Sequence, residues 1–238
     1  MKSSTSTPPK RKRILIVDDH PLMREGIAGW IQRAPNMEVC GHAESASDAL
    51  AMAAKLKPDL VLTDITLTGR DGLELIKDLA AQFPGLPALV LSMHEESLYA
   101  ARALRAGARG YIMKSAGGTR LLQAIEEVLQ GRVAVSQETA TRLLEQFATR
   151  LPGSSNSPLA NLSDREFEVL LLLGKIKTNR EIALQLHLSP KTVESHRLNL
   201  LRKLKLKNSA ELLRFAFQYA ARESPPSFDS SSPSAPCP

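Results

Sequence analysis

Residues 13–19, Arg13-Ile14-Leu15-Ile16-Val17-Asp18-Asp19, join a short apolar run rich in β-branched side chains to two consecutive carboxylates. A run of this length that ends in charged residues is typical of a strand buried on both faces of a parallel sheet. Similar runs occupy residues 59–64, 88–92 and 110–114, with a weaker one at 37–41. Stretches with helical spacing separate them, at residues 22–32, 47–56, 72–82, 97–106 and 119–130. This alternation predicts a doubly wound α/β domain with helices on both faces of the sheet.

The composition of the 238 residues argues against several classes of protein. Apolar residues make up 43% and charged residues 24%, which does not fit a wholly disordered, collagenous or membrane-spanning chain. No apolar run approaches the ~18 residues of a transmembrane helix, and residues 1–13 lack the apolar segment of a secretory signal. Of the two cysteines, Cys40 and Cys237, the second lies in the extreme tail. We therefore expect no disulfide framework, no membrane association, and a location in the reducing cytoplasm.

The net charge of +6 is distributed unevenly along the chain. Residues 1–13 carry five bases and no acids, whereas residues 14–135 carry 12 bases against 15 acids. Residues 162–223 carry 12 bases against seven acids, so this segment is basic. An acidic block followed by a basic block predicts two modules with different partners, because acid clusters bind cations and basic faces bind phosphates.

The basic block has helical spacing throughout, and capping residues mark the start of each expected helix. These are Ser163 with Glu166, Thr178 with Glu181, Ser189 before Pro190, and Asn208 with Glu211. Residues 138–149 also have helical spacing, and the Pro/Gly/Ser-rich residues 151–158 are typical of a linker. We therefore expect a basic disordered tail over 1–12, the α/β domain over 13–133, a linker with a helix over 134–160, a four-helix domain over 161–223 and a disordered tail over 224–238.

Polar side chains lie at or just past the end of each of the four stronger strands: Asp18, Asp19, Asp64, Ser92 and Lys114. Because the strands of one parallel sheet end at a common edge, we expect these side chains to share one crevice. Two carboxylates ~5 Å apart repel by roughly 3 kcal/mol at an effective dielectric of ~20, so three acids need a counter-charge. Lys114 supplies one positive charge, and Mg²⁺, which prefers oxygen ligands, supplies the rest. The crevice is predicted to receive a phosphoryl group, with Asp64 as nucleophile and Ser92 as hydrogen-bond donor.

Residues 13–133 resemble the receiver domain of two-component response regulators. Four short motifs in order carry the resemblance: 17–20 (Val-Asp-Asp-His), 62–65 (Leu-Thr-Asp-Ile), 91–94 (Leu-Ser-Met-His) and 107–114 (Gly-Ala-Arg-Gly-Tyr-Ile-Met-Lys). The resemblance implies a flavodoxin-like sheet of order 2-1-3-4-5 and a sensor histidine kinase as phosphodonor. It also implies roles for six residues: Asp64 as phospho-acceptor, Asp18 and Asp19 with Asp64 as metal ligands, Lys114 as partner of the phosphoryl group, Ser92 as switch hydroxyl, and Tyr111 as the aromatic that moves with it.

The chain departs from the receiver pattern just after the acceptor, where the family usually has Met-Pro and this sequence has Leu67-Thr68. Without the proline the φ angle of the loop is free. Thr66 is expected to overhang the site, so both changes bear on the lifetime of the phosphoryl group. Tyr111 could instead serve packing alone, and His20 could be structural only.

Residues 162–222 resemble the output domain of the LuxR/FixJ/NarL regulators, through residues 162–166, 179–183, 188–193, His196 and 203–204. The resemblance implies a helix-turn-helix over 178–197. The face of the following helix that would enter the major groove of DNA carries Lys191, Thr192, Glu194, Ser195, Leu198, Asn199, Arg202 and Lys203.

Side-chain chemistry divides this face into two roles. Base edges suit Ser195, Asn199 and Glu194, and a thymine methyl suits Leu198. Leu198 could equally pack on a neighbouring helix, and Glu194 could pair with a lysine. Phosphates suit the cations, which position the module without reading sequence: Lys191, Arg197, Arg202, Lys203 and Lys205.

The last predicted helix, over residues 208–222, is apolar nearly all round, so a homodimer seam or the core of its own domain must cover it. We therefore expect a cytoplasmic, DNA-binding transcription regulator that is switched by Mg²⁺-dependent phosphorylation of Asp64 and is not a turnover enzyme. Two alternatives remain open. A Mg²⁺-dependent phosphohydrolase would need a second acid at the position of Thr66, and a phosphorylation-independent DNA-binding protein would use the first domain only for dimerisation.

Overall fold

The computed structural model describes residues 11–67, 72–148, 159 and 162–223. It divides into two compact units, residues 1–157 and residues 158–238, and each is considered by itself. Apart from residues 11 and 12, the predicted tails over 1–12 and 224–238 lie outside the described residues. Within the described part of the chain, no helix is both long and apolar enough to cross a membrane.

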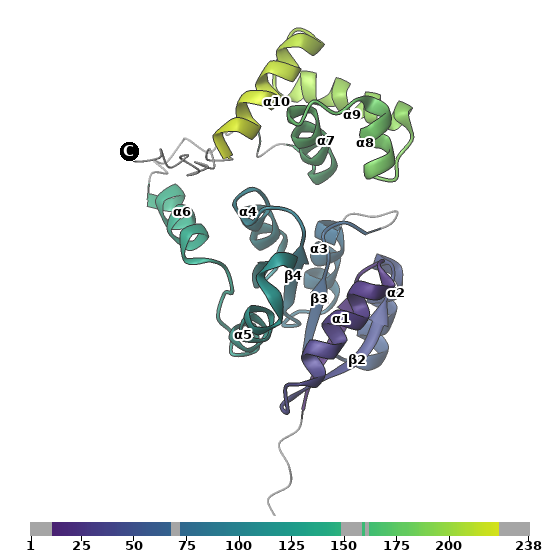
Figure 1. Ribbon diagram of the computed structural model, residues 1–238, viewed down its shortest axis with the longest axis vertical. Helices are drawn as coiled ribbons and strands as arrows, with labels where there is room; N and C mark the ends of the chain where they lie inside the picture. The colour runs from purple at the N-terminus through teal and green to yellow at the C-terminus, as the bar shows by residue number, and fades with distance from the viewer. Residues whose placement is uncertain (1–10, 68–71, 149–158, 160–161, 224–238) are drawn as a thin grey trace, which may run out of the picture. The chain divides into compact units, whose positions relative to one another are not determined.

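The first unit is a parallel sheet whose strands alternate with helices (Figure 1). The sheet is five-stranded with the order β2-β1-β3-β4-β5, which confirms the predicted flavodoxin-like topology. The elements in chain order are β1 (Lys12–Val17), α1 (Pro21–Gln32), β2 (Met37–Ala43), α2 (Ala46–Leu56), β3 (Leu60–Thr63), α3 (Gly72–Gln82), β4 (Ala88–Ser92), α4 (Glu96–Ala106), β5 (Gly110–Met113), the 3-10 turn η1 (Lys114–Ala116), α5 (Gly117–Leu129) and α6 (Gln137–Ala148).

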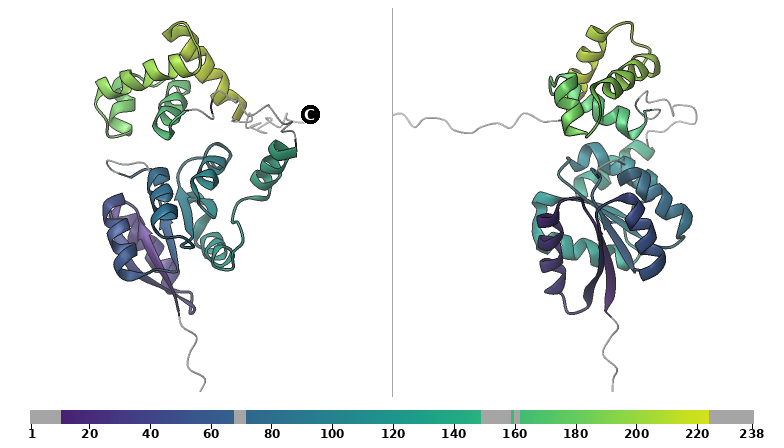
Figure 2. Two further views of the ribbon diagram at one scale, coloured as in Figure 1. Left: turned by 180° about the vertical axis from the view of Figure 1, so that it is seen from behind. Right: turned by 90° about the vertical axis from the view of Figure 1, so that its right-hand side faces the viewer.

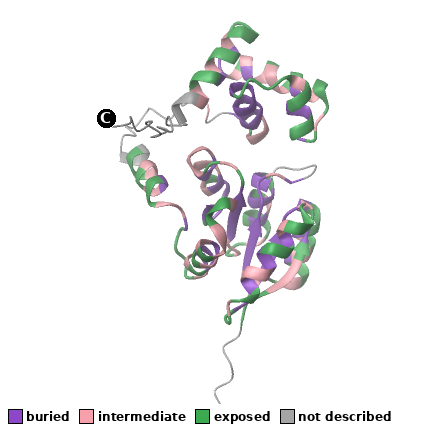
Figure 3. Ribbon diagram, viewed as in Figure 1, coloured by how far each residue is buried: buried purple, intermediate pink, exposed green. Residues whose placement is uncertain are grey.

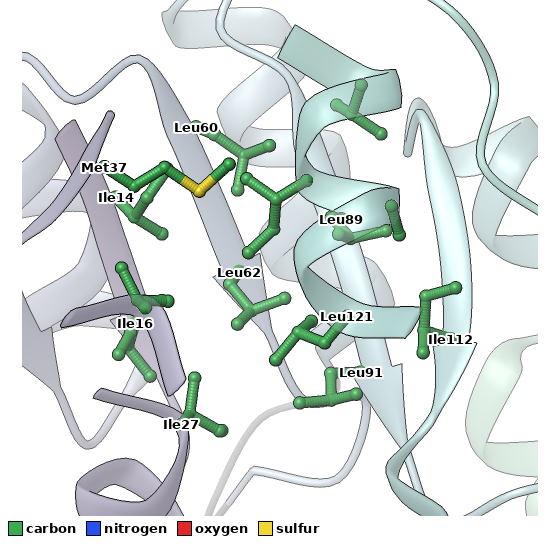
Figure 4. Packing of buried hydrophobic residues seen from close by; sticks show 14 of the residues in the cluster. Ile14, Ile16, Ile27, Met37, Leu60, Leu62, Leu89, Leu91, Ile112 and Leu121 are labelled. Atoms are coloured by element: carbon green, nitrogen blue, oxygen red, sulfur yellow. The ribbon is translucent and has the colours of Figure 1, made fainter. Parts of the chain in front are cut away.

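Helices cover both faces of this sheet (Figure 2). Strand residues alternate between the faces, so Ile14 and Ile16 pack with α1 and α5, whereas Leu15 and Val17 pack with α2 and α3. Figure 4 shows the first of these clusters. Both faces are apolar, which explains why the inner strands β3 and β4 are continuous hydrophobic runs that are buried throughout, whereas the edge strand β2 is partly exposed (Figure 3).

Contacts between neighbouring elements determine two details of this unit. Strand β2 is longer than the predicted 37–41, because its parallel pairing with β1 continues as far as Val17 with Ala43. The ring of Trp30 on α1 lies against the backbone of Gly118 at the start of α5, where a Cβ atom would meet ring carbons at 2.7 Å. A side chain at position 118 would therefore displace the indole.

The second unit contains α7 (Asp164–Gly174), α8 (Asn179–Gln185), α9 (Pro190–Lys203) and α10 (Ser209–Glu223). The predicted caps at Ser163, Thr178 and Ser189 are confirmed, the first two as complete capping boxes. The third box is incomplete. Asn208 Oδ1 accepts the Glu211 N–H, but the Glu211 carboxylate accepts the N–H of Lys207, one residue before the expected partner.

The core of the second unit brings α10 against α7, and α9 packs on α7 and α8. Val193, Leu200 and Leu212 are fully buried at this junction. Gly174 permits close approach of the last turn of α7 to α10, because a Cβ there would lie 2.5 Å from the Ala216 carbonyl oxygen. The predicted helical module is therefore a packed domain in its own right.

Candidate phosphoryl-acceptor site and nucleic-acid interface

Three strand ends bring Asp18, Asp64 and Lys114 into one buried cluster. Lys114 Nζ lies 2.6 Å from Asp18 Oδ2 and 2.6 Å from Asp64 Oδ2. The three side chains are only 2%, 6% and 5% exposed, respectively. The shared edge arises because β1 pairs with β3, β3 with β4, and β4 with β5, all in parallel register. The structure thus brings together these three residues as their position in the sequence predicts.

Asp19 and His20 continue the cluster toward solvent. His20 Nδ1 lies 2.7 Å from Asp19 Oδ1, and the His20 N–H donates to Asp18 Oδ1 at 2.8 Å. One potential ligand atom from each of Asp18, Asp19 and His20 falls within a span of 4.8 Å. The carboxylate oxygens suit Mg²⁺, whereas the imidazole of His20 suits it poorly. The residues present therefore fit a hard divalent cation held by carboxylates.

The electrostatics of the cluster favour added positive charge. Burial is the largest influence on Asp64 and raises the pKa of its carboxyl, although the Lys114 ammonium opposes the shift. Burial alone would lower the pKa of Lys114, but the carboxylates of Asp64 and Asp18 together raise it above its usual value. Lys114 therefore stays charged and offsets one of the three carboxylates. The remaining two negative charges match a divalent cation.

The loop after β4 connects the predicted switch residues through His94. The Ser92 hydroxyl accepts the His94 N–H at 3.2 Å, and the Tyr111 hydroxyl donates to the His94 carbonyl at 2.8 Å. Ser92 and Tyr111 are fully buried, and burial raises the pKa of the Tyr111 phenol. The His94 ring stacks on Tyr99 of α4 with 4.7 Å between ring centroids. The two switch residues therefore share one neighbour.

Thr66 lies between the acceptor and this loop. Its N–H donates to Asp64 Oδ1 at 3.3 Å, and its hydroxyl lies 3.1 Å from His94 Nε2. The sequence predicted a position over the site for Thr66 but gave no sign of its contact with His94, because that contact joins two separate loops. Thr68, the other departure from the family pattern, lies outside the described residues.

The side chains of the predicted nucleic-acid face on helix α9 are either exposed or half-buried. Lys191, Glu194, Ser195, Leu198 and Arg202 are exposed, and Leu198 is 62% exposed. Thr192, Asn199 and Lys203 are half-buried. Within its own unit, Leu198 therefore has the exposure that a contact with a thymine methyl requires.

Two cations assigned to phosphates are engaged within the unit. Lys203 Nζ lies 2.6 Å from Glu166 Oε2, and Arg197 donates to Asn179 Oδ1 at 2.6 Å. Burial raises the pKa of Glu166, but the Lys203 ammonium and the Ser163 N–H outweigh it and hold that pKa below its usual value. Lys203 therefore joins the end of α9 to the start of α7, a role that its sequence position did not indicate.

Comparison with known proteins agrees with both units. The family model of the response regulator receiver domain matches residues 14–126. The family model of the bacterial regulatory proteins of the luxR family matches residues 160–216. The response regulator GacA of Pseudomonas aeruginosa is 35% identical over 208 residues, which cover 87% of this chain and 96% of that protein. The oxygen regulatory protein NreC of Staphylococcus haemolyticus is 34% identical over 210 residues, which cover 87% of this chain and 97% of that protein.

Solved structures of related regulators also match the chain. A LuxR-family two-component response regulator from Aurantimonas sp. SI85-9A1 matches with a TM-score of 0.54 and 37% identity, covering 58% of this chain and 99% of that chain. RcsB of Salmonella enterica serovar Typhimurium, bound to the promoter rprA with the phosphomimetic BeF₃⁻, matches with a TM-score of 0.57 and 28% identity, covering 87% and 99%. The chain belongs to the response regulators that join a receiver domain to a LuxR-type helix-turn-helix domain. It is a two-component regulator of transcription with a DNA-binding output domain.

Proposed function

We propose that Asp64 accepts a phosphoryl group from a sensor histidine kinase and that this transfer switches DNA binding by α9. The observation that carries the proposal is the Lys114 ammonium held 2.6 Å from both Asp18 and Asp64 at the edge of the sheet. A buried carboxylate beside a fixed cation and two further acids has the charge and the donor atoms that phosphoryl transfer requires.

The transfer is a single displacement at phosphorus. A carboxylate oxygen of Asp64 attacks, the phosphorus–nitrogen bond to the kinase histidine breaks, and the imidazole keeps the electron pair and takes a proton from water. Lys114 neutralises charge on the oxygens that surround the phosphorus. Asp18, Asp19 and Asp64 would hold Mg²⁺, which would supply additional positive charge there.

The added charge then shifts the population of two arrangements of the loop after β4. The Ser92 hydroxyl leaves its contact with the His94 N–H and donates to a phosphoryl oxygen. Tyr111, which bonds to the carbonyl of the same histidine, moves with it. The shared neighbour His94 supports the coupled movement.

DNA binding by α9 is supported by its exposed polar face and by the related RcsB, which is bound to a promoter. The exposed Lys191, Arg202 and Lys205 contact phosphates, and the half-buried Arg197 and Lys203 do so once they leave Asn179 and Glu166. The face that reads base edges comprises Thr192, Glu194, Ser195, Leu198 and Asn199.

The phosphorylated chain is proposed to act as a homodimer in the cytoplasm, without turnover of a substrate. Leu213 and Phe217 on α10 are 41% and 55% exposed, while Leu212 and Ala216 on the same helix pack into the core. The inner face therefore packs in its own domain, and the exposed apolar pair supports a second use of the helix as a seam with another copy. Dimers of the related RcsB occur on DNA.

The test compares phosphoryl uptake by the wild-type chain and Asp64→Asn with acetyl phosphate and Mg²⁺. We expect about one phosphoryl group per wild-type chain and none on the variant. Asp59→Asn is the matched control, because Asp59 precedes β3 at the opposite end of the sheet. A phosphoryl group taken up by Asp64→Asn would refute Asp64 as the acceptor. Continuous release of phosphate from a small ester would favour the phosphohydrolase. Equal DNA affinity with and without acetyl phosphate would favour the phosphorylation-independent DNA-binding protein.

A further inference from the structure

Helix α1 buries an arginine in its first turn. Arg24 is 9% exposed, and the turn that it shares with Pro21, Leu22 and Met23 contains no acidic residue. The N-terminus of a helix carries partial positive charge, so a cation is disfavoured there. Arginine is also rarely buried unless it is paired. A residue placed against both tendencies requires a specific local partner.

The partners of Arg24 lie in two loops beside the acid cluster. Arg24 NH1 donates to the carbonyl oxygen of Asp18 at 2.6 Å, and NH2 donates to the carboxylate of Glu44. Glu44 directly follows β2, and the neighbouring Ala43 carbonyl accepts the Asp18 N–H at 3.2 Å. The guanidinium thus joins the loop after β1 to the loop after β2.

The bond to the Asp18 carbonyl acts on both proposed metal ligands at once. That carbonyl belongs to the peptide between Asp18 and Asp19, and the peptide unit is planar and rigid. Holding its oxygen therefore restrains the plane that contains both Cα atoms, from which the two carboxylates project. The fork of the guanidinium can reach two acceptors in fixed geometry, which the single ammonium of a lysine cannot reproduce.

We propose that Arg24, oriented by Glu44, is a positioning residue that sets the Asp18–Asp19 pair in the geometry needed to bind Mg²⁺. The inference rests on the proposed function, because it assigns a support to the same site. Groups that hold metal ligands in place typically change metal affinity about 10–100-fold when they are altered. Arg24 acts through the Asp18 carbonyl and not as a metal ligand, because a guanidinium offers only donors.

The test is calorimetric titration of the full-length chain with MgCl₂, comparing wild type, Arg24→Lys and Glu44→Gln. We expect the dissociation constant for Mg²⁺ to rise about tenfold in Arg24→Lys, and less in Glu44→Gln because the amide still accepts a hydrogen bond. In phosphorylation by acetyl phosphate, the Mg²⁺ concentration for half-maximal rate rises, while the rate at saturating Mg²⁺ stays within about twofold. A role in folding alone would not raise the Mg²⁺ concentration for half-maximal rate while leaving the rate at saturating Mg²⁺ unchanged.

Arg120→Lys is the matched control, because Arg120 makes a partly exposed pair with Glu127 within the same helix, α5. An unchanged Mg²⁺ affinity in folded Arg24→Lys would overturn the positioning role and leave the proposed function intact. If Arg24→Lys fails to fold, the test rests on Glu44→Gln, whose side chain is 69% exposed, and an unchanged affinity there overturns the role. A wild-type chain that takes up no Mg²⁺ would overturn the metal site and the positioning role together.

Discussion

Asp64 holds a carboxylate where only 6% of the side chain meets solvent. Burial disfavours the charged form more strongly than Lys114 favours it, so the pKa of this carboxyl is raised. The protonated acid is then more compatible with the folded chain than the carboxylate is. The residue that the reaction needs therefore lowers the stability of the metal-free protein at neutral pH, as is common at functional sites.

Asp64→Asn should accordingly stabilise the metal-free chain at pH 7 by on the order of 1 kcal/mol. The contribution of Asp64 to stability is present below its ordinary pKa of 3.8 and is lost as the pH rises through the raised value. The advantage of the variant should therefore be near zero below pH 3.8 and should grow toward neutrality. Urea unfolding with a chelator at several pH values measures it, and a variant that is less stable than wild type at pH 7 would contradict the account.

Which site residues the sequence predicts depends on whether a strand or a loop places them. Asp18, Asp64 and Lys114 follow buried strands, and the common edge of a parallel sheet is enough to bring them together. The bond of Arg24 to Asp18 joins a helix to a loop, and the contact of Thr66 with His94 joins two loops, so no periodicity indicates them. The only sign of the first was a basic residue in the opening turn of a helix, beside two acids.

At the scale of the elements, the end of α9 is joined to the start of α7 by Lys203 and Glu166. The Glu166 side chain is 4% exposed and also belongs to the capping box that begins α7. Leaving a buried carboxylate without its cation costs more than losing an exposed ion pair. The orientation of the recognition helix therefore depends on a side chain that was assigned from sequence to DNA.

Lys203→Met should lower the free energy of unfolding of the second unit by about 1–3 kcal/mol. Arg202→Met is the control on the same helix, because Arg202 is exposed and its bond to Asn199 is local. We expect Arg202→Met to keep wild-type stability but to reduce the slope of log affinity for DNA against log salt by about 1. Thermal unfolding by circular dichroism and a salt titration separate the two effects. Equal stability of both variants would show that the Glu166 pair contributes little.

The elements themselves follow from the sequence almost entirely. Caps such as Ser163 and Thr178 fix where helices begin, and the same hydrogen bonds appear in the structure. The C-terminal end of β2 was not predicted, because pairing with β1 extends the strand past the apolar run. The incomplete cap at Asn208 differs for a similar reason, since the Glu211 carboxylate reaches the preceding N–H. Local chemistry thus defines the starts of elements, and neighbouring elements decide their extent.

At the scale of the whole molecule, the outer face of α10 is the proposed link between phosphorylation and DNA. A dimer would present two recognition helices to two half-sites, and binding by both would be much tighter than binding by one. The apolar pair Leu213 and Phe217 is the part of that face that remains exposed in the second unit.

Replacing both residues with serine should abolish dimerisation in the presence of acetyl phosphate and Mg²⁺. DNA affinity for a two-half-site operator should fall by at least about 100-fold, while phosphoryl uptake by Asp64 stays unchanged. Leu184→Ser is the control, because Leu184 on α8 is 73% exposed and lies outside α10. Sedimentation velocity and a DNA-binding titration measure the outcome. A phosphorylated double variant that is still dimeric would place the seam elsewhere.

The chain has a single tryptophan, and its indole lies flat against the backbone of Gly118 at the junction of α1 and α5. Tryptophan fluorescence therefore reports on the receiver domain only. A thermal unfolding curve followed by this fluorescence describes the receiver domain, whereas one followed by far-ultraviolet circular dichroism describes both domains. The difference between the two curves gives the unfolding of the helix-turn-helix domain without a label.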